Sequence, residues 1–187
     1  MRKKDDEKQS NIKKAVIKCI LEEGFHGTSI SKIAKEAGVS PATLYIYYEN
    51  KEVMLHEIYL EYSEEVFYYL LSGITKDMDG RQVIETLIRS YYNYIHDHED
   101  IFHFVEQFSS CPALSNQCEV LKGIYCIHNI FDDMKNKKIL KNFRNDTLLA
   151  VIFSPVKSIS INHCSSESEN LKVLNEAIII IQNALLL

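Results

Sequence analysis

The chain has 187 residues, of which 46% are hydrophobic and 25% charged; this is ordinary for a globular protein and enough to bury a core. Its formal net charge of -5 would argue against a nucleic-acid partner if the charge were evenly spread. However, residues 1–51 hold 10 Lys and Arg against 7 Asp and Glu, whereas residues 52–187 hold 11 against 19. Only the N-terminal quarter is therefore suited to approach a polyanion.

The 5 cysteines form no CxxC pair, and the first residues contain no apolar signal stretch, so we expect a reduced protein of the cytoplasm. The longest apolar run, residues 177–187, is interrupted by Gln182 and Asn183. It is also shorter than the roughly 20 residues that a membrane helix needs. We therefore expect no membrane span, and nothing in the sequence predicts a cofactor.

Apolar residues at three- and four-residue spacing, with only 6 Gly and 3 Pro in the chain, predict an all-α fold of about nine helices. The first helix is expected at about 7–23, with Gly24 as its end. The second is expected at about 29–37, with Thr28 as N-cap and Gly38 as the following turn. Ser40 then caps a helix that begins at Pro41 and ends near residue 48.

A fourth helix, at 51–72 after an N-cap at Asn50, is long enough to link two domains. Further helices are predicted at about 80–97, 100–109, 114–136, 143–162 and 168–187, with a kink at Pro155 in the eighth. We expect a helix-turn-helix DNA-binding domain at 1–50. A ligand-binding and dimerisation domain is expected at 51–187, with 51–72 as the linking helix.

Two short helices joined by a Gly-containing turn are typical of a helix-turn-helix, whose second helix enters the major groove. Residues 24–55, GFHGTSISKIAKEAGVSPATLYIYYENKEVML, resemble the N-terminal signature of the TetR family of bacterial transcriptional regulators. The remainder agrees with this family only in length and helical character. The resemblance implies a regulator, usually a repressor, that binds DNA through the second short helix and responds to a small molecule.

The outward face of the 41–48 helix carries Thr43, Tyr45 and Tyr47, and Lys51 follows it. Hydroxyl and ammonium groups suit phosphate oxygens and base edges. The resemblance implies that Thr43, Tyr47 and Lys51 touch DNA, whereas Tyr45 matches a position that packs or reaches a phosphate. The predicted DNA-binding residues are Ser29, Ser31, Lys32, Ser40, Pro41, Ala42, Thr43, Tyr45, Tyr47 and Lys51.

The last helix has two apolar faces. Residues Leu171, Leu174, Ile178, Ile181 and Leu185 form one seam, and Val173, Ile180, Ala184 and Leu187 form another. One helix with two apolar faces needs two partners, the core of its own subunit and a second subunit. We assign the first seam to the interface of a homodimer, whose two-fold symmetry predicts a palindromic DNA operator.

Aromatic residues and histidines are dense at 91–108, and more rings follow on later helices. Rings leave irregular gaps, and Tyr and His supply the few polar contacts that orient a ligand. We therefore expect a pocket for a small, largely apolar effector. Its predicted lining is Tyr62, Tyr92, His96, Phe104, Phe108, Tyr125, His128 and Phe153.

Metal or redox sensing by the same fold is the alternative. Nine candidate side chains lie in the C-terminal part: His96, His98, His103, Cys111, Cys118, Cys126, His128, His163 and Cys164. His96 and His98 are two residues apart, which on a helix directs them to different faces, so no metal site is predicted from spacing. The sequence also lacks a nucleophile elbow, a phosphate loop and an HExxH motif. An enzyme is thus the remote hypothesis. A purely structural adaptor is disfavoured because it would not explain the polar residues on the outward face of the 41–48 helix.

Overall fold

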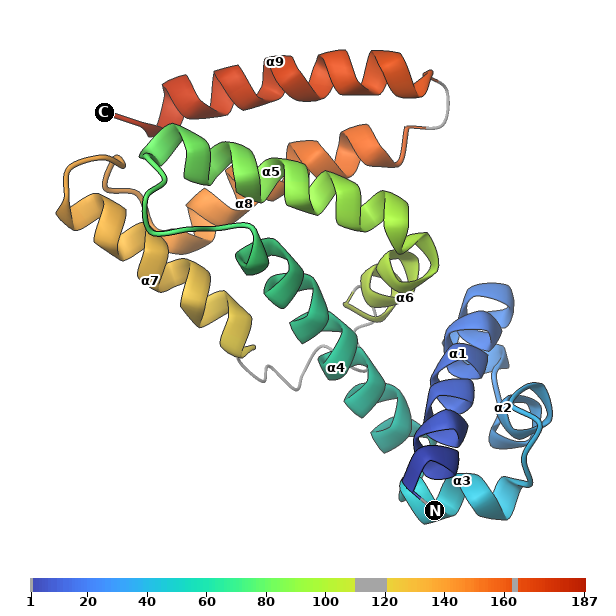
Figure 1. Cartoon of the computed structure of the whole chain (residues 1–187). Coiled ribbons are helices and arrows are strands. Elements are labelled where there is room, and N and C mark those ends of the chain that lie inside the picture. The colour runs from blue at the N-terminus through green and yellow to red at the C-terminus, as the bar shows by residue number, and fades with distance from the viewer. Residues whose placement is uncertain (1, 110–120, 163–164) are drawn as a thin grey trace. The chain divides into compact units, whose positions relative to one another are not determined.

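The computed structural model describes residues 2–109, 121–162 and 165–187, and these residues form nine α-helices (Figure 1). The helices are α1 (Arg2–Gly27), α2 (Ile30–Glu36), α3 (Pro41–Tyr47), α4 (Lys51–Ser72), α5 (Gly80–Asp97), α6 (Glu99–Ser109), α7 (Lys122–Asn136), α8 (Asn145–Ser160) and α9 (Glu167–Leu185). The all-α prediction is confirmed. None of these helices is both long and apolar enough to cross a membrane.

The helices pack as two compact units, which we name here. Unit 1 comprises residues 1–63 and 99–119, and unit 2 comprises residues 64–98 and 120–187. Helix α6 thus packs with the N-terminal helices, and α4 contributes its first part to unit 1 and its remainder to unit 2. The boundaries of these packing units differ from those of the two expected functional domains, 1–50 and 51–187. The division into functional domains stays a prediction.

The end of α1 is built around Gly24, whose φ of 71° lies in the left-handed region that favours glycine. The predicted break is therefore present, although one more helical turn follows it, to Gly27. Thr28 is buried, and its hydroxyl donates to the carbonyls of Cys19 and Gly24 at 3.0 and 2.8 Å. Thr28 consequently ties the end of α1 together, and the prediction that it caps α2 is wrong.

Helices α2 and α3 have side-chain caps at their first turns. Ser29 is the N-cap of α2 and accepts from the backbone N–H of Lys32, and Ser40 is the predicted N-cap of α3. Gly38, with φ 67°, makes the turn between them. Asn50 accepts from the N–H of Val53 at 2.9 Å, which confirms the cap before α4.

The core of unit 1 is made by α1, α2, α3, the first half of α4, and α6. Its members include Ile12, Ile33, Leu44, Leu55 and Phe104, each of them fully buried. Phe108 of α6 stacks on Tyr59 of α4 with ring centroids 4.3 Å apart. The short helices α2 and α3 are therefore held by this shared core rather than by their own propensity.

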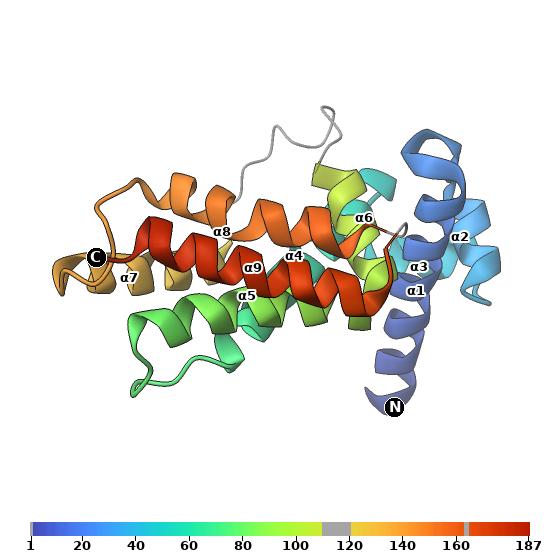
Figure 2. The same ribbon diagram turned by 90° about the horizontal axis from the view of Figure 1, so that it is seen from above.

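In unit 2, α5, α8 and α9 lie side by side, with α7 and the end of α4 completing the core (Figures 1 and 2). Helix α7 begins at Lys122, after extended backbone at Leu121, later than the predicted 114. Residues 114–120 of that prediction lie outside the described residues. Helix α8 continues across Pro155.

Helix α9 corrects the predicted dimer interface. Leu174, Ile178, Ile181 and Leu185 are each at most 4% exposed and belong to the core of unit 2, whereas Leu171, at the start of that seam, is 39% exposed. The second seam is the open one, because Val173, Ile180 and Leu187 are exposed. The first seam of α9 therefore packs into the core of unit 2, and the second seam is left exposed.

Replacing Phe104 with alanine is expected to destabilise the protein by about 3 to 5 kcal/mol, because it leaves a cavity among α1, α4 and α6. Urea denaturation followed by circular dichroism measures the change. Tyr68→Ala, at a ring that is 58% exposed on α4, is the control and should change stability by no more than about 0.5 kcal/mol. Equal stability of wild type and Phe104→Ala would contradict the packing of α6 in this core.

Candidate nucleic-acid interface

The buried residue Leu44 determines which face of α3 points outward. Leu44 is completely buried, so the residues on either side of it must turn away from the core. Pro41 and Ala42 are exposed at the start of the helix, and Tyr45 is 57% exposed. This surface is formed by adjacent residues on one short helix, as a major-groove reading surface requires.

Ser40 and Thr43 hold each other at the start of α3. The Ser40 hydroxyl accepts from the N–H of Thr43 at 3.2 Å, and the two side-chain oxygens are 2.9 Å apart. Each hydroxyl also retains acceptor capacity for a water or a donor group. The two hydroxyls are therefore pre-positioned at the same end of the helix, although the cap already uses part of the capacity of Ser40.

Tyr47 and Tyr48 are neighbours with different environments. The hydroxyl of Tyr47 donates to the carboxylate of Asp5 near the start of α1, which raises the pKa of Tyr47. Tyr48 is 8% exposed, and burial raises its pKa to about 12. Tyr47 therefore presents a polar group at the surface, whereas Tyr48 belongs to the core.

The two predicted cationic contacts are engaged within unit 1. The ammonium of Lys51 donates to the backbone carbonyls of Phe25 and Thr28 at 3.1 and 3.0 Å and lies 4.7 Å from the centre of the Phe25 ring. Lys32 pairs with Glu23 and also donates to the Gly27 carbonyl at 3.2 Å. Both cations thus stabilise the carbonyl-rich end of α1.

Ile46 is the surface residue that sequence reasoning missed. Its side chain is 78% exposed on α3, beside Tyr45. An aliphatic side chain at this position is suited to the methyl group of thymine. The sequence could have indicated that Ile46 is exposed, because it lies two residues from the inward-facing Leu44. On a helix this spacing places the two side chains on opposite faces. Ser29 and Ser31 of the predicted set are also exposed.

The eight residues predicted to line an effector pocket do not form one group. Phe104 and Phe108 are buried in the core of unit 1, where Tyr62 contacts the Phe104 ring edge-on. In unit 2, His96 packs on Tyr92 with ring centroids 4.5 Å apart, and Phe153 contacts Tyr91 at 5.1 Å. His128 is half-buried on α7.

The predicted lining is divided between the two units and stays a prediction. Tyr125 is 55% exposed. Phe104 and Phe108 are packing residues, because α6 lies against α1 and α4.

The His and Cys side chains in the described ranges are scattered. Cys19 is buried and Cys126 exposed, and His103 lies 3.7 Å from Glu99. Among residues 2–109, 121–162 and 165–187, no three His, Cys, Asp or Glu side chains are grouped to hold a metal ion. The candidates Cys111, Cys118, His163 and Cys164 lie outside the described residues.

Residues 12–58 match the family model for bacterial regulatory proteins of the tetR family. The matched segment runs from the middle of α1 through α3 to the first part of α4. The chain is also 28% identical over 135 residues to the fatty acid metabolism regulator protein of Bacillus subtilis, covering 71% of this chain and 68% of that protein.

Solved structures extend the likeness over the whole chain. A TetR family transcription regulator from Marinobacter aquaeolei VT8 has a TM-score of 0.85 and 26% identity, covering 100% of this chain and 99% of that one. The fold is shared with the transcriptional regulator FadR from Bacillus subtilis, crystallised in complex with stearoyl-CoA, at a TM-score of 0.74, 21% identity and coverages of 92% and 97%. With its helix-turn-helix and full-length match, the chain belongs to the TetR family of bacterial transcriptional regulators.

Proposed function

We propose that the chain is a homodimeric repressor of the cytoplasm that binds a palindromic operator and is released from it by a small, largely apolar effector. The outward face of α3, which presents Thr43, Tyr45, Ile46 and Tyr47 from a rigid core, is the observation that carries the proposal. Hydroxyl groups and an aliphatic side chain that protrude from one short helix are suited to base edges and thymine methyls in the major groove.

The dimer is supported by the open face of α9. Val173 is 49% exposed, Ile180 66% and Leu187 76%, and Val151 is exposed on α8, the helix that packs against α9. Exposed apolar side chains gathered on two neighbouring helices indicate a surface that another protein covers. Pairing of α8 and α9 with the same helices of a second copy makes a self-complementary, two-fold interface. The operator then has two half-sites about 34 Å apart or a multiple of this distance.

The effector is assigned to unit 2. Similarity to a fatty acid metabolism regulator, and the shared fold with a FadR that was crystallised with stearoyl-CoA, support an effector with an acyl-like apolar part. An effector that releases DNA must bind the DNA-incompetent arrangement more tightly, and DNA must weaken effector binding by the same factor.

Tyr47→Phe is expected to weaken specific operator binding by about 1 to 3 kcal/mol if the lost hydroxyl makes a base contact. The operator comes from selection of bound sequences from random duplex DNA, and fluorescence anisotropy gives the affinity. Tyr48→Phe is the matched control and should bind like wild type, because Tyr48 is a core residue. Equal affinity of Tyr47→Phe and wild type would remove Tyr47 from the reading surface.

Asp5→Ala is expected to lower the pKa of Tyr47 towards its ordinary value, because the hydrogen bond to Asp5 is the main cause of the raised pKa. Ultraviolet titration of phenolate formation, compared with Tyr47→Phe, measures the shift. The same variant should bind the operator more tightly, since it frees the hydroxyl and removes an anion near the phosphates. Asp6→Ala serves as the control, and identical titrations for both variants would speak against the contact.

Ile180→Asp is expected to produce a folded monomer, because it places a charge in the open apolar face of α9 without touching the core. Analytical ultracentrifugation at micromolar concentration reports the oligomeric state, and circular dichroism reports the helices. Ser168→Asp adds the same charge to an exposed position of α9 that lies off this face and should leave the dimer intact. A wild-type chain that sediments as a monomer would refute the dimer itself.

A further inference from the structure

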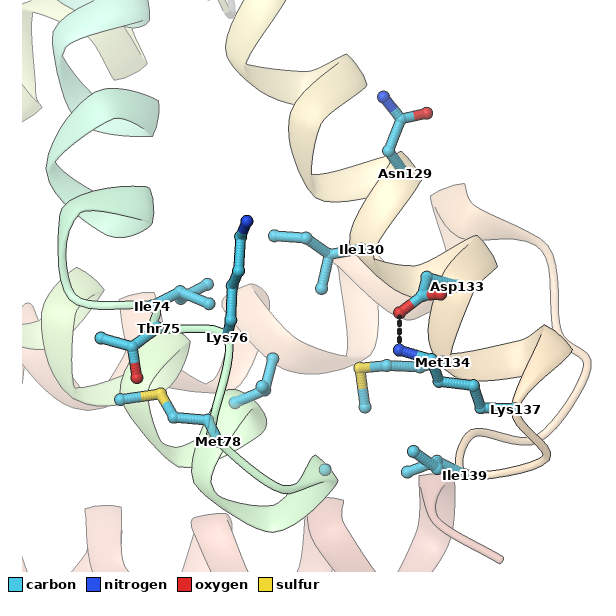
Figure 3. A pocket seen from close by; sticks show the side chains of 12 residues that line it. Ile74, Thr75, Lys76, Met78, Asn129, Ile130, Asp133, Met134, Lys137 and Ile139 are labelled. Atoms are coloured by element: carbon cyan, nitrogen blue, oxygen red, sulfur yellow. Dashed lines mark hydrogen bonds and ion pairs between the residues drawn. The ribbon is translucent and has the colours of Figure 1, made fainter.

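Unit 2 contains a pocket of about 580 Å³ between the link from α4 to α5, the start of α5, helix α7 and the link from α7 to α8 (Figure 3). This volume lies within the range of small-molecule sites. Aliphatic and thioether side chains form its walls: Ile74, Met78, Ile130, Met134 and Ile139. None of the eight residues that the sequence predicted for an effector pocket lines it.

The walls are held by close packing at the start of α5. Gly80 is buried, and a Cβ atom at this position would lie 2.3 Å from Cγ2 of Ile139. The link between α7 and α8 can therefore approach α5 only because residue 80 is glycine. This link is fixed further by Lys141, whose backbone N–H and ammonium donate to the carbonyls of Leu185 and Ala184 at 2.9 and 2.7 Å.

The ionisable side chains of the pocket lining carry one more positive than negative charge. Three ionisable residues line the pocket. Lys137 pairs with Asp133 at 2.7 Å, whereas Lys76 forms no ion pair with any described residue. Figure 3 shows the Lys76 side chain extending along the pocket towards Ile130 of α7.

The neighbouring acid does not neutralise Lys76 inside the pocket. Asp77 accepts a hydrogen bond from the Thr75 hydroxyl at 2.6 Å, which lowers the pKa of Asp77, and its side chain is not part of the lining. With Asp133 matched by Lys137, one uncompensated ammonium remains beside apolar walls. A long apolar surface with a single cation at its edge is complementary to a molecule that has the opposite pattern.

We propose that this pocket binds an amphiphile with an aliphatic tail and one anionic head group, either a carboxylate or a phosphate. The tail lies between the isoleucine and methionine side chains, and the head group accepts hydrogen bonds from the ammonium of Lys76. Methionine suits a flexible tail because its thioether adapts to irregular gaps. The proposal rests on the proposed function in one respect, namely that the effector is a small molecule held by unit 2.

Isothermal titration of the full chain with octanoate, octyl phosphate and 1-octanol, all below micellar concentrations, tests the proposal. Octanoate or octyl phosphate should bind about tenfold more tightly than 1-octanol, because only they make a charge-assisted hydrogen bond to Lys76. Which anion binds better identifies the head group. Decanoate should bind more tightly than octanoate, by about fourfold for each added methylene that is buried.

Two variants distinguish the contact with the anionic head group from the contacts with the aliphatic tail. Lys76→Met should weaken octanoate binding about tenfold and leave 1-octanol unchanged, whereas Ile130→Trp should weaken both by filling the pocket. Lys122→Met is the matched control, since Lys122 is an exposed lysine at the start of α7 that does not line the pocket. Circular dichroism confirms that each variant is folded, and Met78→Trp replaces Ile130→Trp if the latter is not.

Several results would overturn the proposal: equal affinity for octanoate and 1-octanol, wild-type octanoate binding by Lys76→Met, or no binding by a folded protein. If Lys76→Met changes the sedimentation of the protein instead of octanoate binding, the pocket is a contact between copies and the proposal is wrong. Operator binding is measured separately on the same samples. Loss of operator binding with intact octanoate binding would count against the proposed function, and the reverse result would count against the pocket.

Discussion

The burial of Leu44 in the core of unit 1 is the constraint on which the proposed DNA-facing surface depends. A seven-residue helix is too short to be stable alone, so α3 keeps its orientation only through this contact and those of its neighbours. Once Leu44 points inward, helical geometry directs Tyr45 and Ile46 outward. The core that orients them includes Phe104 of α6, far along the chain, so the proposed reading surface depends on residues outside the helix-turn-helix.

At the end of α1, the ammonium of Lys51, a predicted DNA contact, is used for hydrogen bonds within the protein. The left-handed backbone at Gly24 interrupts the helix and leaves carbonyls without helical donors. Thr28 and Lys51 supply the donors, through a buried hydroxyl and an ammonium. Lys51 is therefore a positioning residue for the start of α4, and any contact that it makes to a phosphate must share or replace these hydrogen bonds.

Unit 2 distributes its apolar surface between an interior, an open helix face and a pocket. The buried seam of α9 also contains Asn170 and Gln182, whose amides are satisfied by the carbonyls of Asn162 and Arg81 at 3.3 and 2.9 Å. Buried polar groups with partners cost little and restrict the register of the packing. The opposite face has no such anchors, which is consistent with a surface that a second, identical helix covers.

Local sequence determined the all-α fold, the caps at Ser40 and Asn50, the break at Gly24 and the family, because turn residues and helical periodicity act over a few neighbouring positions. Tertiary packing alone decided which apolar face of α9 is buried, since both faces have helical spacing and only the neighbours α5 and α8 distinguish them. It also placed Phe104 in unit 1 and brought Lys76 beside residues of α7, because such contacts join residues that are far apart in the chain.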